Sequence, residues 1–364
     1  MAQDQQIQRD LQVLIQSRHD LEAKLQNEKG ELSDRTIGEY SQQYGKLQRS
    51  LMTVFKSSSD EQERIGAMLE MIRIMENELV YLQNFVVEQS ADNSVLASLV
   101  GRFLDTLSES NRSPMTPLEI LYYRAVAALY AGDTASAAAG FRNACESDES
   151  DEANDIKYKS YVILGNISHD QQDFEQARQM HDRSLQYSQH SNVTAQALAF
   201  KALNCYALKN FDEALQLFEQ SLELFDEGEP FFNSYFHRNA LLFCGAIYSQ
   251  RKEYGKAESF YRRVIDQVEP NSYDHFDALS QLGKICYSTN RMDDAAEFFK
   301  QAIETQTANA NENEYIVDIY FWLARTQLKR SNGLEARRLL EKVASSDAKY
   351  ERKSQAMELL QRVS

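Results

Sequence analysis

The sequence predicts an all-α fold: a right-handed α-solenoid of helix-turn-helix repeats, preceded by an N-terminal helical hairpin or coiled-coil region. Three observations indicate this fold. Between residues 118 and 345, two small residues twelve positions apart are followed four positions later by a larger side chain, and this pattern occurs six times. The 364 residues include only four prolines and thirteen glycines, which favours helices over strands and tight turns. The first 57 residues carry apolar seams with coiled-coil spacing.

The repeated pattern explains why glycine recurs inside predicted helices. Gly165, Gly245 and Gly283 each lie twelve residues before an alanine. An interior glycine costs a helix about 1 kcal/mol relative to alanine, so its recurrence indicates a packing requirement. Two antiparallel helices approach closely only where small residues meet at their crossing. The larger residues are expected to fill the gap toward the next repeat, and they are Phe141, His181, Phe218, Tyr261, Phe299 and Leu340.

These spacings resemble the motif of the tetratricopeptide repeat family, which has a small residue at its eighth position, alanine at its twentieth and an aromatic residue at its twenty-fourth. In the fifth repeat, Gly283, Ala295 and Phe299 occupy these three positions. The repeats recur every 37 to 43 residues, a longer period than the 34 residues of the family, so we expect longer helices or longer connections. The resemblance implies about six repeats over residues 118–364, ended by a C-terminal capping helix.

The first 110 residues differ in pattern from the repeats. One apolar seam comprises Ile7, Leu11, Leu14, Leu21, Leu25 and Leu32, and a second comprises Ile37, Tyr40, Tyr44, Leu47, Leu51 and Val54. We predict a helical hairpin or coiled coil over residues 1–57 whose seams close on each other or on a second chain, which leaves a homodimer open. Residues 58–110 are predicted to be helical and to pack on the hairpin or on the first repeat. A stripe of Met68, Met71 and Met75 on one helix face is expected in the core.

Composition and motifs argue against catalysis and against nucleic acid. A net charge of −16 disfavours binding to phosphates and to anionic membranes. The sequence contains no phosphate-binding loop, nucleophile motif or metal-ligand spacing, so no catalytic residue, cofactor or metal is predicted and no enzyme is expected. The four cysteines lie tens of residues apart and are interpreted as reduced core thiols. With no signal-peptide pattern and no apolar run of bilayer length, the sequence predicts a cytoplasmic location without membrane insertion.

Two histidines occur in related segments of neighbouring repeats. His237 lies in NSYFHRNAL and His275 in NSYDHFDAL. Because the two segments correspond in the repeat pattern, we expect a repeated structural role at the start of the first helix.

The resemblance implies that binding takes place on the concave face formed by the first helix of each repeat. The candidate partner-binding residues are Asn166, Phe200, Tyr206, Asn239, Phe243, Lys284, Tyr287, Phe321, Trp322, Arg325 and Lys329. Their aromatic side chains would form an apolar strip bordered by lysine and arginine, and exposed apolar strips usually mark binding sites. Two other interpretations stay open. The strip could be core between repeats, or the N-terminal helices of the chain could occupy it.

The sequence therefore predicts a non-enzymatic protein–protein interaction adaptor or scaffold. Its partner is expected to be a helical or extended protein or peptide segment that is amphipathic and has an acidic edge. The alternative function is a peptide-sensing regulatory protein whose N-terminal helices are repositioned by a ligand peptide. The two functions share the concave face and differ in what the N-terminal helices do.

Overall fold

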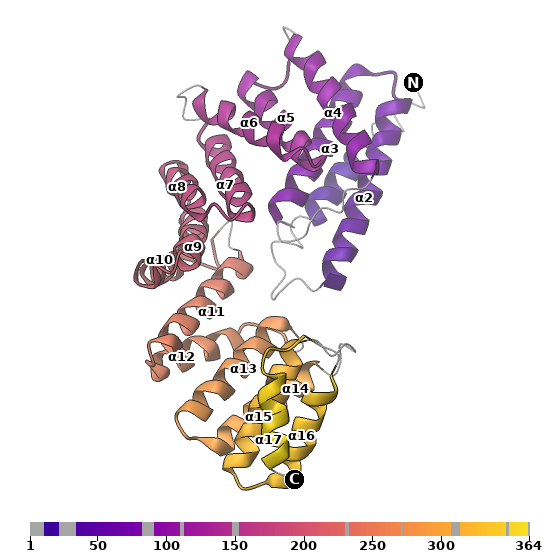
Figure 1. Cartoon of the computed structure of the whole chain (residues 1–364). Helices are drawn as coiled ribbons and strands as arrows, with labels where there is room; N and C mark the ends of the chain where they lie inside the picture. Colours follow the sequence, from indigo (N-terminus) through magenta and orange to yellow (C-terminus); the bar gives the residue numbers. More distant parts are fainter. Residues whose placement is uncertain are drawn as a thin grey trace. The chain divides into compact units, whose positions relative to one another are not determined.

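The computed structural model describes residues 11–21, 34–81, 91–109, 113–147, 153–229, 233–270, 272–306, 314–346 and 349–362, and Figure 1 shows how their helices follow one another. In these ranges the regular structure is helical throughout and includes no strand. The N-terminal elements are a helix over residues 11–21, α2 (Asp34–Ser57), α3 (Glu61–Tyr81) and α4 (Ala91–Glu109).

Helix pairs make up the rest of the described chain, and each pair has a first and a second helix joined by a short turn. The pairs are α5 (Pro117–Tyr130) with α6 (Thr134–Glu146), α7 (Asn154–Asp170) with α8 (Phe174–Ser184), α9 (Ser191–Ala207) with α10 (Phe211–Leu224), α11 (Ser234–Gln250) with α12 (Tyr254–Ile265), α13 (Tyr273–Ser288) with α14 (Met292–Gln306), and α15 (Glu314–Lys329) with α16 (Gly333–Ser345). A 3-10 turn, η2 (Leu185–Tyr187), follows α8, and α17 (Lys353–Arg362) follows the last pair. A second helix also packs on the next first helix, as α6 does on α7 and α14 on α15. This stacking is the predicted helix-turn-helix solenoid.

The chain divides into two compact units. The first contains the N-terminal helices and α5–α10, up to Asn233, and the second contains α11–α17, from Ser234 onward. In the first unit, one apolar core extends from the N-terminal helices into the first two repeats, and its buried members include Tyr44, Met71, Leu104, Phe141 and Leu164. The N-terminal helices are thus part of the same packed body as the first repeats.

The turn inside each repeat has the same backbone geometry in all six pairs. One turn residue has a positive φ: this is Gly132 in the first repeat and, in the others, Gln172, Lys209, Lys252, Asn290 and Ser331. The next N–H donates to the carbonyl five residues earlier, as from Asp173 to Ser168 at 2.9 Å. This is the Schellman arrangement that satisfies the last carbonyls of a helix. Asp133, Asp173 and Asn332 then cap the second helix by accepting an N–H three residues later.

The helix-crossing glycines contact the larger residue of their own repeat. A Cβ at position 165 would lie 2.2 Å from His181 Nε2, and one at position 283 would lie 2.5 Å from Phe299 Cε1. The larger residue therefore packs within its own repeat, and His181 also reaches the next repeat as expected, where its ring stacks on Phe200. The ring lies on the bare glycine backbone, where there is room because the glycine has no side chain. The predicted packing requirement for a small residue at this position holds.

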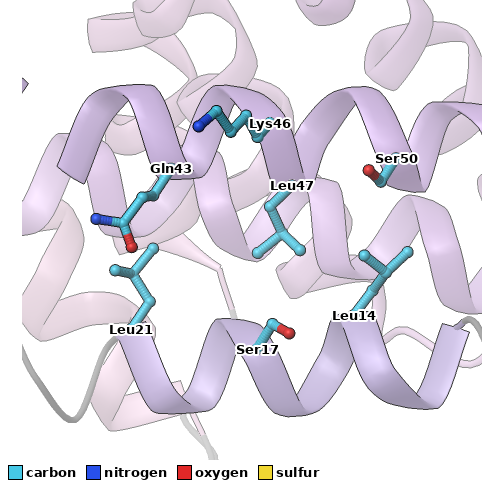
Figure 2. A pocket seen from close by; sticks show the side chains of 7 residues that line it. All are labelled: Leu14, Ser17, Leu21, Gln43, Lys46, Leu47 and Ser50. Carbon is cyan, nitrogen blue, oxygen red and sulfur yellow. The ribbon is translucent and has the colours of Figure 1, made fainter. Parts of the chain in front are cut away.

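The N-terminal seams face each other within one chain where the structure describes them. Figure 2 shows Leu14, Ser17 and Leu21 of the helix at 11–21 opposite Leu47 and its neighbours on α2. Leu11, Leu21, Tyr44, Leu47, Leu51 and Val54 are buried, so these seam residues pack within the chain. The methionine stripe, Met68, Met71 and Met75, is fully buried on α3, as predicted. The seam residues Ile7, Leu25 and Leu32, and the side chains of Ile37 and Tyr40, lie outside the described part.

Candidate functional site

In the first unit, the candidate residues lie on α7 and α9 and take part in local packing. Phe200 stacks on His181 with ring centroids 4.9 Å apart, and Tyr206 meets Phe211 edge-on at 5.3 Å. Asn166, Phe200 and Tyr206 are all partly buried. Phe200 therefore supports the contact between neighbouring repeats and Tyr206 packs within its own repeat, while both present some surface, which agrees in part with the core interpretation.

A polar network beneath Phe200 holds this packing together. Asn204 accepts a hydrogen bond from His169 Nδ1 at 2.7 Å and donates one to His181 Nδ1 at 2.9 Å. It also donates to the Phe200 carbonyl at 2.8 Å. Burial of the imidazole lowers the pKa of His181 to about 3, and the nearby His169 adds to this shift. His181 is therefore neutral at pH 7 and takes the position that aromatic residues fill in other repeats.

In the second unit, two of the predicted surface aromatics belong to the core. Phe321 is only 1% exposed and Tyr287 only 9%, so neither presents the apolar surface expected of it. Tyr287 packs edge-on against Trp322 with ring centroids 5.3 Å apart, and Phe321 packs against Tyr350 with ring centroids 6.0 Å apart. Trp322 and Arg325 on α15 remain partly exposed, as do Asn239 and Phe243 on α11, and Lys329 is exposed.

Around these residues the structure places a group that we call the cation–aromatic patch. Its members are Lys284, Tyr287, Trp322, Arg325, Lys329 and Arg352, from α13, α15 and the turn before α17. The Arg325 guanidinium lies 5.0 Å from the Trp322 ring centroid and 5.1 Å from that of Tyr287. Lys329 Nζ lies 4.0 Å from the Tyr287 centroid, and the Arg352 guanidinium lies 5.3 Å from that of Trp322. These are cation–π distances, so the rings hold the cations in place.

Two carboxylates lie at the patch: Glu351 is exposed and 3.5 Å from Arg352 Nε, and Asp318 is more buried. The Oδ2 of Asp318 is 2.8 Å from Lys284 Nζ, and its Oδ1 accepts a hydrogen bond from the Tyr350 hydroxyl at 2.6 Å. Arg352 approaches the same Oδ1 at 3.5 Å. Burial and the hydrogen bond to Asp318 raise the pKa of Tyr350 above its usual range. Tyr350 and Arg352 escaped prediction because they precede the capping helix and lie outside the repeat pattern.

Two positive charges in the patch, those of Arg325 and Lys329, are not neutralised by a carboxylate of the patch. Among the described residues, Arg325 and Lys329 have no carboxylate within ion-pair distance. The indole N–H of Trp322 is buried and has no hydrogen-bond partner there. Three kinds of donor, a guanidinium, an ammonium and an indole N–H, therefore lack an anionic acceptor. This contrasts with the overall net charge of −16.

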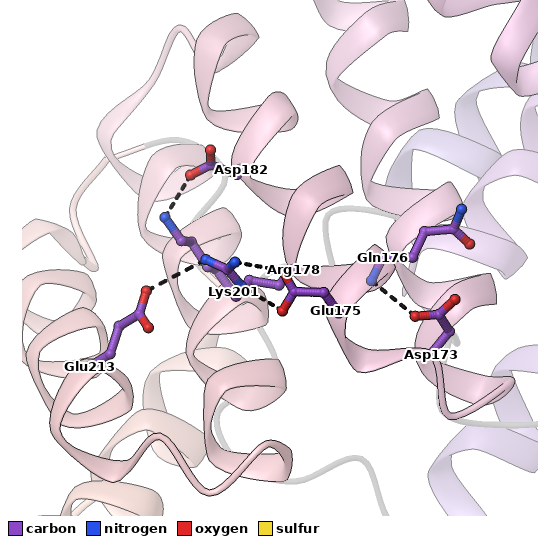
Figure 3. Close-up of polar contacts among 7 residues, drawn as sticks. All are labelled: Asp173, Glu175, Gln176, Arg178, Asp182, Lys201 and Glu213. Atoms are coloured by element: carbon purple, nitrogen blue, oxygen red, sulfur yellow. Dashed lines mark hydrogen bonds and ion pairs between the residues drawn. The ribbon is translucent and has the colours of Figure 1, made fainter.

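Several cations elsewhere on the repeats are paired with carboxylates. Figure 3 shows Lys201 with Asp182 at 2.5 Å, and Arg178 between Glu175 at 2.6 Å and Glu213 at 3.8 Å, across α8, α9 and α10. Exposed pairs of this kind contribute little to stability. Their charges are matched, which is the ordinary state of a solvated surface.

At the other end of the repeats, α3 contacts the first helices directly. Glu76 is only 7% exposed and accepts hydrogen bonds from the hydroxyls of Tyr122 at 3.0 Å and Tyr123 at 3.3 Å. It also pairs with Lys159 of α7 at 3.0 Å. Burial, followed by the charge of Glu76, raises the pKa of Tyr122 well above its usual range. The N-terminal helices therefore cover part of the first-helix face in repeats one and two.

The described residues form no group of three histidine, cysteine or acidic side chains that could hold a metal. The four cysteines are buried and none is in a disulfide, and burial raises the pKa of Cys145 to about 12 and of Cys286 to about 11. A thiol with so high a pKa is a poor nucleophile at neutral pH. In the part of the chain that was searched, no helix is both long and apolar enough to span a bilayer.

Comparison with known proteins agrees with this geometry. Residues 158–227 and 237–308 match the model of the tetratricopeptide repeat family, and these stretches contain nearly all of α7–α14. These stretches are tetratricopeptide repeats. The repeats α5–α6 and α15–α16 lie outside the matched stretches although they share the same turn geometry. Tetratricopeptide repeats generally act as non-enzymatic protein–protein interaction modules, and this fold is of that kind.

Two solved structures illustrate the fold. The C-terminal part of a TPR repeat-containing protein from Cytophaga hutchinsonii is 13% identical, with a TM-score of 0.55 over 79% of this chain and 99% of that one. BtubC (BKLC) from P. vanneervenii is 14% identical, with a TM-score of 0.50 over 67% of this chain and 93% of that one. At these identities the likeness concerns the fold alone. A search of the curated proteins found no match.

Proposed function

We propose that this tetratricopeptide repeat protein is a non-enzymatic scaffold that binds a helical or extended segment of a partner protein on the face formed by its first helices. The observation that carries this proposal is the cation–aromatic patch, where partly exposed aromatic surface lies beside cations without an acidic partner. Apolar surface bordered by charge is typical of a protein-binding site. The same features favour an amphipathic partner with an acidic edge.

Site-specific photo-crosslinking tests the proposal. A photoreactive residue is placed at Asn239, Gln281 or Lys329 on first helices, and at Glu297 or Arg337 on second helices as controls. The five proteins are irradiated in native lysate, and cross-linked partners are identified by mass spectrometry. The proposal expects one partner to cross-link from the first-helix positions and not from the controls. Cross-links from the second-helix positions alone would place binding on the opposite face and contradict it.

The contact between α3 and the first repeats favours the second candidate, a peptide-sensing regulator. Glu76 holds Tyr122, Tyr123 and Lys159, so a ligand that competes for Lys159 would release α3. Hydrogen exchange of α3 with and without a bound peptide tests this function. A ligand that leaves the exchange of α3 unchanged would contradict it.

A further inference from the structure

The cation–aromatic patch carries a more specific inference about the partner, and this inference rests on the proposed scaffold function. Arg325 and Lys329 are four residues apart on α15, so they occupy one helix face in successive turns. Residues with this spacing lie about 6 Å apart along a helix. The patch therefore offers two cations at a defined separation.

The rings fix the position of these cations without neutralising them. Arg325 lies near the rings of Tyr287, Phe321 and Trp322, and Lys329 lies over Tyr287. A cation–π contact restrains a cation electrostatically, but it leaves the N–H donors free to bind an acceptor. An arginine held in this way loses less conformational entropy when it binds a carboxylate. The buried indole N–H of Trp322 beside them also lacks an acceptor.

We propose that the patch recognises a partner helix that presents two carboxylates one helical turn apart, with Arg325 and Lys329 each binding one of them. Charge complementarity favours an acidic partner, because Arg325 and Lys329 are cations without a carboxylate beside them, although the chain has a net charge of −16. Two acidic residues at i and i+4 of a helix have the same separation of about 6 Å as the two cations. The apolar residues between them would lie against Trp322.

Asp318 limits how much of the patch is available. Its carboxylate already binds Lys284 at 2.8 Å and Tyr350 at 2.6 Å, so it acts as an internal competitor for the cations at that end. Removing this carboxylate would free Lys284 for an incoming acid and leave Arg352 with Glu351 as its remaining acidic partner. Asp318→Asn is therefore expected to strengthen the binding of an acidic helix, whereas loss of the Arg325 and Lys329 charges weakens it.

Intrinsic fluorescence offers a direct readout because Trp322 is the single tryptophan of the chain. The probe is a synthetic amphipathic helical peptide with glutamates at i and i+4 beside a leucine stripe. One control peptide carries glutamine at both places, and another carries the two glutamates at i and i+2. Each is titrated into the full chain and into three variants: Arg325→Gln/Lys329→Gln, Asp318→Asn, and the matched control Arg337→Gln/Arg338→Gln on α16.

We expect the peptide with glutamates at i and i+4 to bind at least about tenfold more tightly than either control peptide. This preference should be lost in Arg325→Gln/Lys329→Gln, kept in Arg337→Gln/Arg338→Gln and increased in Asp318→Asn. Equal binding of the three peptides, or no binding of any, would overturn it. Photo-crosslinking of a partner from the first-helix face would still support the scaffold function in that case, so the two failures are distinguishable.

Discussion

Single residues at the helix crossings determine how closely the two helices of a repeat approach. The contacts at Gly165, Gly245 and Gly283 show this most clearly, because an added Cβ at each would lie 2.8 Å or less from an imidazole or aromatic ring. The rings concerned are buried and cannot move away without disturbing the next repeat. Overpacking in such a place costs stability.

We predict that Gly283→Ala destabilises the second unit by about 1–3 kcal/mol, because its Cβ would lie 2.5 Å from the Phe299 ring. Gly255→Ala in α12 is the matched control, since no atom lies within 4 Å of the added Cβ there. That substitution should be neutral or stabilise by up to about 1 kcal/mol. Urea unfolding followed by circular dichroism measures both changes. Equal effects of the two substitutions would contradict the crossing argument.

His181 differs from the other ring residues because it titrates. Its pKa is lowered to about 3 by burial, against about 6.5 for an exposed histidine, so the unfolded chain binds the proton more strongly in this interval. Above about pH 6.5 the histidine is neutral in both the folded and the unfolded chain, so its titration does not reduce the free energy of unfolding. Below that pH the unfolded chain binds the proton first, and the free energy of unfolding falls as the pH falls.

We predict that the free energy of unfolding falls between pH 7.5 and 5.5, and that His181→Phe removes up to about 1.4 kcal/mol per pH unit of this slope. Phenylalanine is the matched replacement, because Phe299 already lies over a glycine in the fifth repeat. Denaturant unfolding at several pH values gives the slope for each protein. Identical slopes would show that another group, and not His181, is responsible.

At the scale of whole elements, the turn between paired helices recurs with one strained residue. Lys252 has a φ of 62° and Gly132 a φ of 82°, although only glycine adopts such values without strain. The hydrogen bonds of the turn impose this conformation whatever residue is present. Because several residue types occupy these positions, the sequence alone does not indicate where the positive φ occurs.

Lys252→Gly is expected to stabilise the second unit by up to about 1 kcal/mol, since relief of strain exceeds the added entropy of the unfolded chain. The reverse change in the first unit, Gly132→Lys, should destabilise by about 1–2 kcal/mol. Thermal unfolding of both variants tests the pair. Changes of the same sign in the two proteins would argue against a left-handed residue as the common cause.

A buried ion pair joins the starts of α11 and α13. Arg238 Nε lies 2.8 Å from Asp274 Oδ2, and Arg238 is only 1% exposed. Its two terminal nitrogens have no hydrogen-bond partner in the described structure, so the guanidinium depends on one carboxylate. His237, which is buried, and His275, which is only partly buried, lie next to this pair in the recurring segments.

We expect Asp274→Asn to destabilise the second unit by about 3–5 kcal/mol, because it leaves a buried cation unpaired. The double change Arg238→Met/Asp274→Leu removes both charges and should cost clearly less. Thermal unfolding of Arg238→Met, of Asp274→Leu and of the double variant gives the coupling free energy. Additive losses would mean that the two side chains do not depend on each other.

For the molecule as a whole, periodic features could be predicted from the sequence and non-periodic ones could not. The six repeats, the crossing glycines and the methionine core follow from spacing alone, since each recurs with helical or repeat geometry. Phe321 is buried with its ring against that of Tyr350, and the roles of Asp318, Tyr350 and Arg352 likewise depend on the turn before α17. Neither is encoded in a local pattern.

Packing of the N-terminal helices against the repeats depends on the same kind of non-local contact. Glu76 is buried on α3 and joins it to α5 and α7 through two tyrosine hydroxyls and Lys159. Asp105 on α4 also links to α5, through Arg124 at 2.6 Å, but its side chain is 64% exposed. Glu76 thus makes a buried link, and Asp105 an exposed link, between the N-terminal helices and the first repeats.

We predict that Glu76→Ala raises hydrogen exchange in α3, α5 and α7 together, because it leaves the buried Tyr122 hydroxyl without its acceptor and Lys159 without this partner. A buried group left unsatisfied in this way costs about 1–3 kcal/mol. Asp105→Ala removes only an exposed ion pair and should change stability by less than about 1 kcal/mol. Exchange measured by mass spectrometry resolves the three helices. If the rise were confined to α3, Glu76 would not couple the N-terminal helices to the repeats, and the peptide-sensing alternative would lose its structural basis.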